Sequence, residues 1–511
     1  MNSSSQTFYR LPEYLYTSQQ VRAGEQEAAE HLNLAMYTLM ERAGQAVFDM
    51  LVERYPDARS ILICCGRGNN GGDGYIVGGL AIKAGFQVLL WQIGEANSLS
   101  GDAKRAMEAF VDAGGEIHAP CNEIPESVDV IIDGLLGTGI TGEVRPFYAH
   151  LIDRINQASC PILSIDTPSG LDTDTGALLG HTVEADATIS FIGLKRGLVT
   201  GKARAYTGVL CFAGLGVERA FDDLITSNVI LSQPNWLEQL LPRERDAHKG
   251  CHGRALVVGS GSGMSGACYL ASAAALRAGA GLVAVQCHED SALAIRSLLP
   301  EAMVSSYNSQ SLQSRLDWCS GVALGMGLGR DKWGGKVFEQ VVTTVSERGL
   351  PCVLDADALY WLSKEYYPLN PLNCIITPHP GEAAMLLGCS VAEIEQDRFE
   401  AVRKLQARYG GIVVLKGAGT LIDNGMDTVV CHAGNPGMAT GGTGDLLAGT
   451  ILALLIGGHS VFHSAVLGTL IHSLAADQEA LRHGETGMLA SDILPGIRQF
   501  SNNCLFNSES K

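Results

Sequence analysis

The chain has 511 residues, more than one ordinary hydrophobic core holds, so we expect two domains. An apolar content of 46% with 61 glycines indicates an α/β protein with glycine-rich loops rather than a disordered chain or a coiled coil. The 36 Lys and Arg residues against 54 Asp and Glu give a net charge of −18. No run of basic residues offsets this charge, which excludes nucleic acid and anionic membranes as partners.

The amino-terminal ten residues are polar and have neither the basic nor the apolar region of a secretory signal. The most apolar window, 446–456, is too short to span a bilayer and predicts a buried helix. The 14 cysteines include no CxxC pair, and several lie in apolar, strand-like runs. We therefore expect reduced thiols and a cytoplasmic protein.

Regular alternation of short apolar runs and helical segments dominates the chain. A capped amphipathic helix is expected from Thr17 or Ser18 to about Tyr55. Strands are then expected at 61–65, 88–93, 128–132, 162–165, 187–192 and 209–212. The pattern lapses in a mixed, polar stretch at about 217–236, which predicts a boundary between domains 1–222 and 223–511.

Alternation restarts with expected strands at 255–258, 282–286, 321–324, 352–354, 374–376 and 412–415, and with a helix of small residues at 267–280. Such alternation is typical of mostly parallel sheets covered by helices on both faces. The two halves share no repeat, so the sequence predicts two different α/β domains.

A glycine-rich loop, 66–74, follows the first of these strands and reads Gly-Arg-Gly-Asn-Asn-Gly-Gly-Asp-Gly. It contains the G-x-G-x-x-G spacing between a strand and a helix, which is typical of dinucleotide binding. A nicotinamide dehydrogenase therefore stays an alternative, with Glu95 as a ribose contact. The two asparagines and the aspartate make the loop rich in oxygen atoms, which suits a pyrophosphate poorly.

Two further acids occupy similar places. Asp133 ends the third expected strand, before the glycine-rich run 134–139, and Asp166 follows the fourth, before 167–170. Ligands of open α/β sheets bind beyond the carboxyl ends of the strands. Acids that gather there need a cation or a protonatable substrate, whereas each alone could merely cap a loop.

These motifs carry a resemblance. Residues from about 10 to 215 resemble the NAD(P)HX epimerase domain, a Rossmann-like three-layer αβα fold, through the 66–74 loop, Asp-Gly-Leu-Leu-Gly-Thr-Gly and Asp-Thr-Pro-Ser-Gly-Leu. The resemblance implies a potassium ion held by Asn70, Asp133 and Ser169, and Asp166 as the acid/base residue. The substrate-binding positions that it implies are Asn69, Asn70, Gly71, Gly72, Asp73, Gly137, Thr138, Gly139, Ile140, Thr141, Gly142, Glu143 and Asp166.

In the second half, the run 435–449 is a glycine-rich loop that opens into an apolar helix and contains Asp445. Its glycines at 441, 442 and 444 allow backbone N–H groups to point toward an anion. The dipole of the helix that follows also attracts negative charge. A carboxylate beside a phosphate site suits a base that deprotonates an attacking hydroxyl, although a first-turn acid can also simply compensate the dipole. Lys416 suits a nucleotide phosphate, and His379 is held between two prolines.

Residues from about 228 to 502 resemble the ribokinase-like branch that contains ADP-dependent NAD(P)H-hydrate dehydratase. The shared motifs are His-Lys-Gly, Ser-Gly-Ala, Asp-Ala-Asp-Ala-Leu, Thr-Pro-His-Pro-Gly-Glu, Lys-Gly-Ala-Gly-Thr and Gly-Asn-Pro-Gly-Met-Ala-Thr-Gly-Gly-Thr-Gly-Asp. The resemblance implies nucleotide contacts at Lys416, Gly417, Ala418, Gly419, Thr420 and Gly444, and substrate contacts at Ala267, Gly327, His379 and the catalytic base Asp445. Met264 departs from the family, which often has an aromatic residue there.

Together the halves resemble a bifunctional repair enzyme for hydrated nicotinamide dinucleotides. The resemblance implies that R- and S-NADHX and NADPHX are epimerised and that the S form is dehydrated with ADP, giving AMP and phosphate. Magnesium is expected for phosphoryl transfer, and family members tend to self-associate. The alternatives are a small-molecule kinase fused to a dinucleotide-sensing module, and the dehydrogenase, which leaves the second half unexplained.

Overall fold

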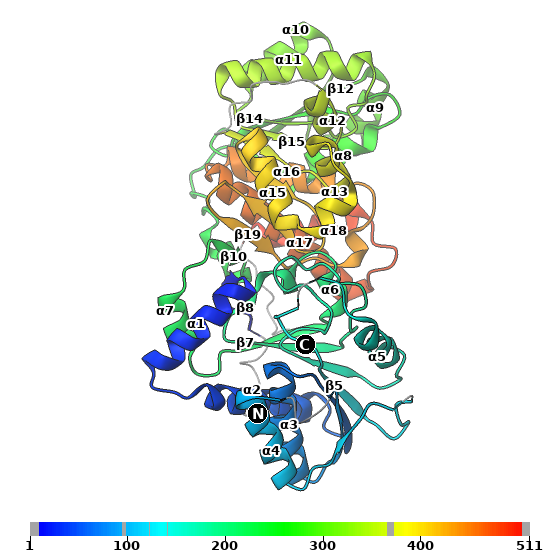
Figure 1. Ribbon diagram of the computed structural model, residues 1–511. Helices are drawn as coiled ribbons and strands as arrows, with labels where there is room; N and C mark the ends of the chain where they lie inside the picture. Colours follow the sequence, from blue (N-terminus) through cyan, green and yellow to red (C-terminus); the bar gives the residue numbers. More distant parts are fainter. Residues whose placement is uncertain (1–9, 95–98, 122, 141, 365–372, 503–511) are drawn as a thin grey trace. The chain divides into compact units, whose positions relative to one another are not determined.

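The computed structural model describes residues 10–94, 99–121, 123–140, 142–364 and 373–502. The chain forms two compact units, Met1–Val229 and Ile230–Lys511 (Figure 1). Each unit is an α/β structure built on its own set of parallel strands.

The first unit contains a seven-stranded sheet with the order β4-β3-β2-β5-β6-β7-β9, in which every neighbouring pair is parallel. Its strands are β2 (Ser60–Cys65), β3 (Gln87–Gln92), β4 (Ile117–His118), β5 (Val130–Gly134), β6 (Ile162–Ile165), β7 (Ala187–Phe191) and β9 (Val209–Ala213). The six strands expected from the sequence are confirmed, and the two-residue β4 is added at the edge.

Helices cover both faces of this sheet, which makes the unit a three-layer structure. Alternate residues of β2 divide between two cores: Ile61 and Ile63 pack with the helices α2 and α3, whereas Leu62 and Cys64 pack with α5. The helices are α1 (Ser18–His31), α2 (Met36–Arg54), α3 (Asn69–Lys83), α4 (Gly101–Asp112), α5 (Pro146–Asn156), α6 (Ala203–Tyr206) and α7 (Glu218–Leu224), and β1 (Tyr14–Tyr16) pairs with β8 (Leu194–Lys195).

The single helix expected from residue 17 to 55 is wrong, because the chain breaks between α1 and α2. Thr17 caps α1 as expected and forms a capping box with Gln20. The break follows His31: Leu32 is 41% exposed, and Asn33 adopts a left-handed φ of 54°. The break lets α1 turn away and pack against α7.

The second unit contains a sheet with the order β13-β12-β11-β14-β15-β16-β17-β18-β19. Its strands are β11 (Arg254–Gly259), β12 (Leu282–Cys287), β13 (Met303–Ser306), β14 (Gly321–Leu324), β15 (Cys352–Leu354), β16 (Cys374–Ile376), β17 (Ile412–Leu415), β18 (Thr420–Asp423) and β19 (Thr428–Cys431), with β10 (Val229–Leu231) at the division between the units. Pairing is parallel as far as β17 and antiparallel along β17, β18 and β19. The six expected strands are confirmed; β13 and the final hairpin were not expected.

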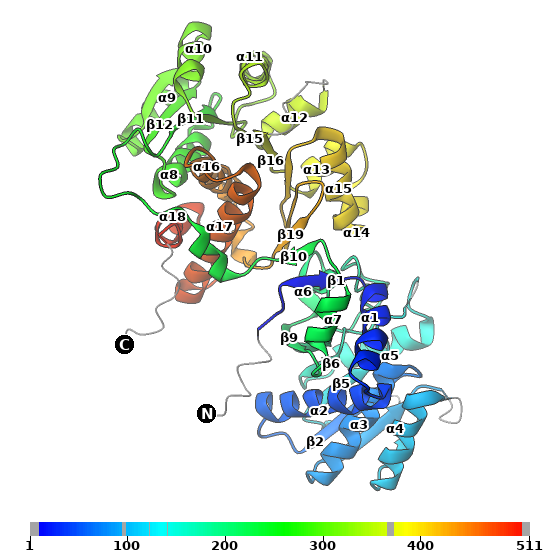
Figure 2. The same cartoon turned by 90° about the vertical axis from the view of Figure 1, so that its left-hand side faces the viewer.

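One face of this sheet packs against α8 (Ser265–Arg277), α16 (Thr443–Ile456), α17 (Val461–His483) and α18 (Ala490–Phe500). The helices α11 (Lys332–Arg348), α12 (Asp357–Lys364), α13 (Pro380–Leu387) and α15 (Arg398–Tyr409) lie on the other side of the strands (Figure 2). The window 446–456 lies in α16 as a buried helix, as expected. Among the described residues, no helix is both long and apolar enough to cross a membrane.

Candidate active sites

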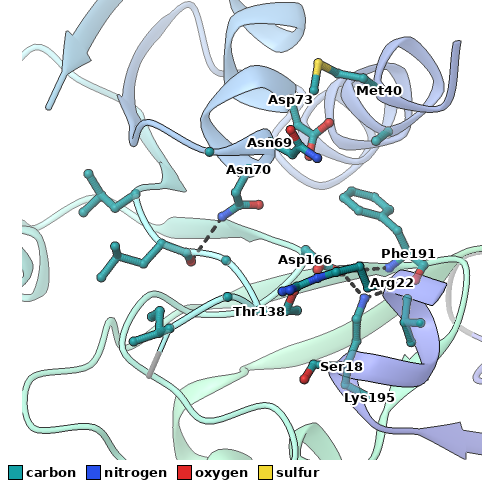
Figure 3. Close-up of a pocket in the computed structure, with 18 of the residues that line it drawn as sticks. Ser18, Arg22, Met40, Asn69, Asn70, Asp73, Thr138, Asp166, Phe191 and Lys195 are labelled. Carbon is teal, nitrogen blue, oxygen red and sulfur yellow. Dashed lines mark hydrogen bonds and ion pairs between the residues drawn. The ribbon is translucent and has the colours of Figure 1, made fainter. Parts of the chain in front are cut away.

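The first unit contains a cavity of about 640 Å³ beyond the carboxyl ends of its central strands. Its walls come from α1, from the start of α3 and from the loops that follow β5, β6 and β7 (Figure 3). Of the substrate positions inferred from the sequence, the following line the cavity: Asn69, Asn70, Asp73, Gly137, Thr138, Gly139, Ile140, Glu143 and Asp166. Gly71, Gly72 and Gly142 do not line it, and Thr141 lies outside the described residues.

Asp166 stands directly after β6, in a left-handed conformation with a φ of 62°. Its Oδ1 accepts hydrogen bonds from the Lys195 ammonium at 2.5 Å and from the Phe191 backbone N–H at 3.1 Å (Figure 3). Its other oxygen, Oδ2, accepts none from any residue that the structure describes. The lysine therefore fixes one oxygen of the carboxylate and leaves the second for a ligand.

Lys195 was not expected from the sequence. Its side chain is only 2% exposed, and its sequence signal is a Lys-Arg pair, 195–196, that interrupts an apolar run. Among the other acids that line the same cavity are a buried one, Asp73 on α3, and a half-buried one, Glu25 on α1. Burial is the main cause that raises the pKa of each acid, and the charge of Asp166 raises both further. The cavity thus gathers several proton-exchanging groups around one buried cation.

Two glycines of the G-x-G-x-x-G spacing, Gly66 and Gly71, allow close packing, whereas a Cβ on Gly68 would meet open space. A Cβ on Gly66 would lie 1.9 Å from the Leu135 carbonyl oxygen, and one on Gly71 would lie 2.2 Å from the Gly66 carbonyl oxygen. The backbone of β2, its loop and α3 therefore fits together only with glycine at these positions. Glu95, the ribose contact of the dehydrogenase alternative, lies outside the described residues.

Of the three residues inferred to hold potassium, Asn70 lines this cavity, and the Leu136 carbonyl accepts hydrogen bonds from both Asn70 and Ser169. Asp133 is fully buried and accepts hydrogen bonds from the Ser169 hydroxyl at 2.6 Å and from the Ser169 N–H at 2.8 Å. The amide of Asn70 donates to the Leu136 carbonyl at 3.2 Å, and its buried Oδ1 has no partner within the described part of the chain (Figure 3). This orphaned oxygen, with a carboxylate and a hydroxyl nearby, is a donor set that suits a hard monovalent cation.

The second unit has a cavity of about 490 Å³, which brings together Asp355, His379, Glu382, Lys416 and Asp445. The Lys416 ammonium lies 2.6 Å from Asp355 Oδ1 and 3.8 Å from Glu382 Oε2. Burial opposes the charge on this lysine, but the two carboxylates outweigh it and raise its pKa. The roles of Asp355 and Glu382 were not expected, although both lie in motifs that follow strands.

Asp445 lies in the first turn of α16, at the cavity wall. Gly442 precedes this helix with a φ of 95°, a conformation that favours glycine, whereas Gly441 and Gly444 are not left-handed. A Cβ on Gly444 would lie 3.4 Å from the Lys416 ammonium, so the helix start lies against the charged pair. Burial, followed by the charge of Asp355, raises the pKa of Asp445 to about 7. A carboxylate that titrates near neutral pH is suited to act as a general base.

His379 caps α13 with its side chain. Its Nδ1 accepts hydrogen bonds from the N–H groups of Gly381 at 3.0 Å and Glu382 at 3.2 Å. Glu382 in turn accepts from the His379 N–H at 2.8 Å. The ring is therefore held by the helix that it caps, and 56% of it stays exposed at the cavity.

The remaining positions inferred for this site divide between the cavity and its surroundings. Gly417 and Gly444 line the cavity, whereas Ala418, Gly419, Thr420, Ala267 and Gly327 do not. Ala267 and Gly327 lie together beside Met264, since a Cβ on Gly327 would be 3.1 Å from a side-chain atom of each. This second cluster lies at the start of α8, beyond β14.

Both units match known families. Residues 36–197 match the sequence model described as the YjeF-related protein N-terminus, and residues 255–499 match the one described as NAD(P)H-hydrate dehydratase. The chain is 49% identical to the bifunctional NAD(P)H-hydrate repair enzyme of Vibrio cholerae, over 97% of this chain and 100% of that one. It is 44% identical to the enzyme of the same name from Escherichia coli, over 96% of this chain and 95% of that one.

Among solved structures, a ribokinase-like superfamily protein from Enterococcus faecalis matches with a TM-score of 0.51 and 26% identity, over 55% of this chain and 97% of that one. This likeness confirms the ribokinase-like fold expected of the second half. The two sequence models and the two full-length relatives confirm the family that the motifs indicated. The chain therefore belongs to the family of bifunctional NAD(P)H-hydrate repair enzymes.

Proposed function

We propose that the chain repairs hydrated NADH and NADPH in two steps, with one step in each unit. The first unit interconverts the R and S epimers of the hydrate, and the second dehydrates the S epimer with ADP as phosphoryl donor, giving AMP and phosphate. One observation carries this proposal: each cavity holds a carboxylate suited to proton transfer, Asp166 in the first and Asp445 in the second.

In the first unit, Asp166 exchanges a proton with the hydrated ring through its open Oδ2, while Lys195 holds Oδ1. The side chains of Asn70, Asp133 and Ser169 hold a potassium ion, which the orphaned Asn70 oxygen supports. The ion supplies a fixed positive charge beside the substrate when it is bound. Burial raises the pKa of Asp133, and a cation held there would favour its charged form.

In the second unit, Asp445 accepts the proton of the C6 hydroxyl as that oxygen attacks the terminal phosphorus of ADP. The new O–P bond forms as the bond from this phosphorus to AMP breaks, and AMP leaves. Loss of phosphate from C6 and of a proton from C5 then restores the C5–C6 double bond of the ring. Lys416 and the start of α16 stabilise the phosphoryl charge. The carboxylates of Asp355 and Glu382 suit magnesium, which neutralises phosphate charge when it is bound.

Two matched variants test whether the first unit catalyses epimerisation and the second unit dehydration. Asp166→Asn is expected to spare dehydration of the S epimer and to block use of the R epimer, whereas Asp445→Asn blocks both. Each variant retains one intact unit, so mixing the two restores repair of the R epimer. The assay supplies each epimer of hydrated NADH with ADP and magnesium and follows the absorbance band of reduced nicotinamide.

Consumption of the R epimer by Asp166→Asn well above its spontaneous rate would remove Asp166 from the epimerisation. Accumulation of a phosphorylated hydrate, without release of phosphate, would instead support the fused kinase. From the family resemblance we also propose that the protein self-associates and acts in the cytoplasm. Sedimentation velocity of the purified protein tests the first of these two expectations.

A further inference from the structure

The helix α1 forms a wall of the first cavity, although it lies outside residues 36–197, the part of the unit that the family model matches. Its contributions to the lining are Ser18, Val21, Arg22 and Glu25. The cavity therefore contains side chains that residues 36–197 do not supply. Arg22 is the only cation among these four.

Several contacts fix the position of α1. The Ser18 N–H and hydroxyl donate to the Asp174 carboxylate at 2.6 and 3.1 Å. On the inner face of the helix, a Cβ on Gly24 would lie 2.4 Å from the Phe221 ring, so the helix packs closely on α7. Arg22 is thus carried by a helix that is anchored both at its start and along its buried side.

From this position, the Arg22 side chain extends across the cavity toward Thr138 (Figure 3). A terminal nitrogen of its guanidinium lies 3.5 Å from the place of a Cβ on Gly139. Thr138 and Gly139 belong to the loop after β5, which is rich in glycine and lines the cavity. The guanidinium and this loop therefore face the same part of the cavity.

Within the described part of the chain, the Arg22 guanidinium is held in no hydrogen bond or ion pair, although its charge acts to lower the pKa of Glu25 on the same helix. Lys195, the buried cation of the same cavity, is by contrast paired with Asp166. A guanidinium binds phosphate oxygens through two parallel hydrogen bonds. In a chain of net charge −18, a dinucleotide needs such a local cation at its phosphates.

We propose that Arg22 binds the pyrophosphate of the hydrated dinucleotide against the loop that contains Gly139, so that α1 is part of the substrate site. The inference rests on the proposed epimerisation. It assigns Arg22 to binding: the phosphates lie at the guanidinium, and the hydrated ring lies at the open oxygen of Asp166.

Epimerisation without ADP tests this role, because the second unit does not turn over without its phosphoryl donor. Chromatography separates the R and S forms and gives kcat and KM for two substrates, hydrated NADH and hydrated reduced nicotinamide riboside, which has no phosphate. The variants are Arg22→Gln and Arg22→Lys. Lys104→Gln is the control. It also removes a cation, but Lys104 pairs with Glu108 on the exposed side of α4, and neither residue lines the cavity.

For Arg22→Gln we expect KM for hydrated NADH to rise at least about tenfold, with kcat nearly unchanged. A rise of about tenfold is the effect expected when one hydrogen bond to a charged group is lost. For Arg22→Lys we expect a KM for hydrated NADH between those of Arg22→Gln and the wild type. The KM for the phosphate-free substrate should not change in either variant. Equal losses on both substrates would place Arg22 at the ring, and an unchanged KM would remove it from the site; either result overturns the inference. Absence of epimerisation by the wild-type protein would instead overturn the proposed function itself.

Discussion

The raised pKa of Asp445 makes dehydration dependent on pH in a predictable way. Burial and the charge of Asp355 move this pKa from 3.8 to about 7, so the base is protonated in about nine molecules in ten at pH 6 and in about one in ten at pH 8. If Asp445 is the base, kcat/KM for ADP, which reports groups of the free enzyme, rises about tenfold between these two pH values.

Asp355→Asn tests the cause of the shift. It removes a negative charge that raises the pKa of Asp445, so the acidic limb of the profile is expected to move to lower pH. The assay is release of phosphate from the S epimer of hydrated NADH at limiting ADP. A profile that stays flat between about pH 5.5 and pH 8 would refute the assignment of Asp445 as the base.

The same shift affects stability. Because the folded pKa of about 7 lies above the unfolded value of 3.8, the folded state binds this proton more tightly, and its stability falls as pH rises through this window. Burying the charged carboxylate lowers the free energy of unfolding by on the order of a few kcal/mol at pH 8 and by less at pH 5. Asp445→Asn removes this loss. Its unfolding temperature should therefore exceed that of the wild type mainly at pH 8. The control Asp492→Asn, in the first turn of α18, should show no such gain.

Two further predictions concern the first unit. Replacing potassium by a large organic cation such as tetramethylammonium should slow epimerisation several-fold and leave dehydration of the S epimer unchanged; equal epimerisation rates in both salts would argue against a cation held by Asn70, Asp133 and Ser169. Gly24→Val should destabilise this unit by about 1–3 kcal/mol, because its Cβ would meet the Phe221 ring. Gly79→Ala is the control, since open space surrounds that position, and calorimetry showing equal losses for both variants would contradict the packing argument.

The strands of both sheets could be predicted because parallel strands buried on both faces form short continuous apolar runs. The hairpin of β18 and β19 was missed because its first residue, Thr420, belongs to the motif that was assigned to the nucleotide loop. The break after His31 was missed because the apolar spacing of α1 continues into α2, and the four residues 32–35 between the helices, with Asn33 left-handed, contain neither glycine nor proline.

The acids at strand ends could be inferred because a carboxylate at the edge of a parallel sheet has few structural reasons to be there. Lys195 and Arg22 could not, because one belongs to a Lys-Arg pair that looks like an ordinary exposed pair of charges and the other lies on the polar side of an amphipathic helix. Their importance depends on distances to Asp166 and to Gly139, which join segments far apart in the chain. Such pairings arise from the tertiary fold, and no local pattern encodes them.

The left-handed backbone of Asp166 has counterparts after strands of both units. Ile192 follows β7 with a φ of 63°, Ser260 follows β11 with 46°, and Ala356 lies just beyond β15 with 50°. Residues with a Cβ adopt this region at a cost of about 1–2 kcal/mol each. Glycine at these positions would relieve the cost and raise heat resistance. Ile192 and Ala356 line the two cavities, so replacing either of them should also lower catalytic activity.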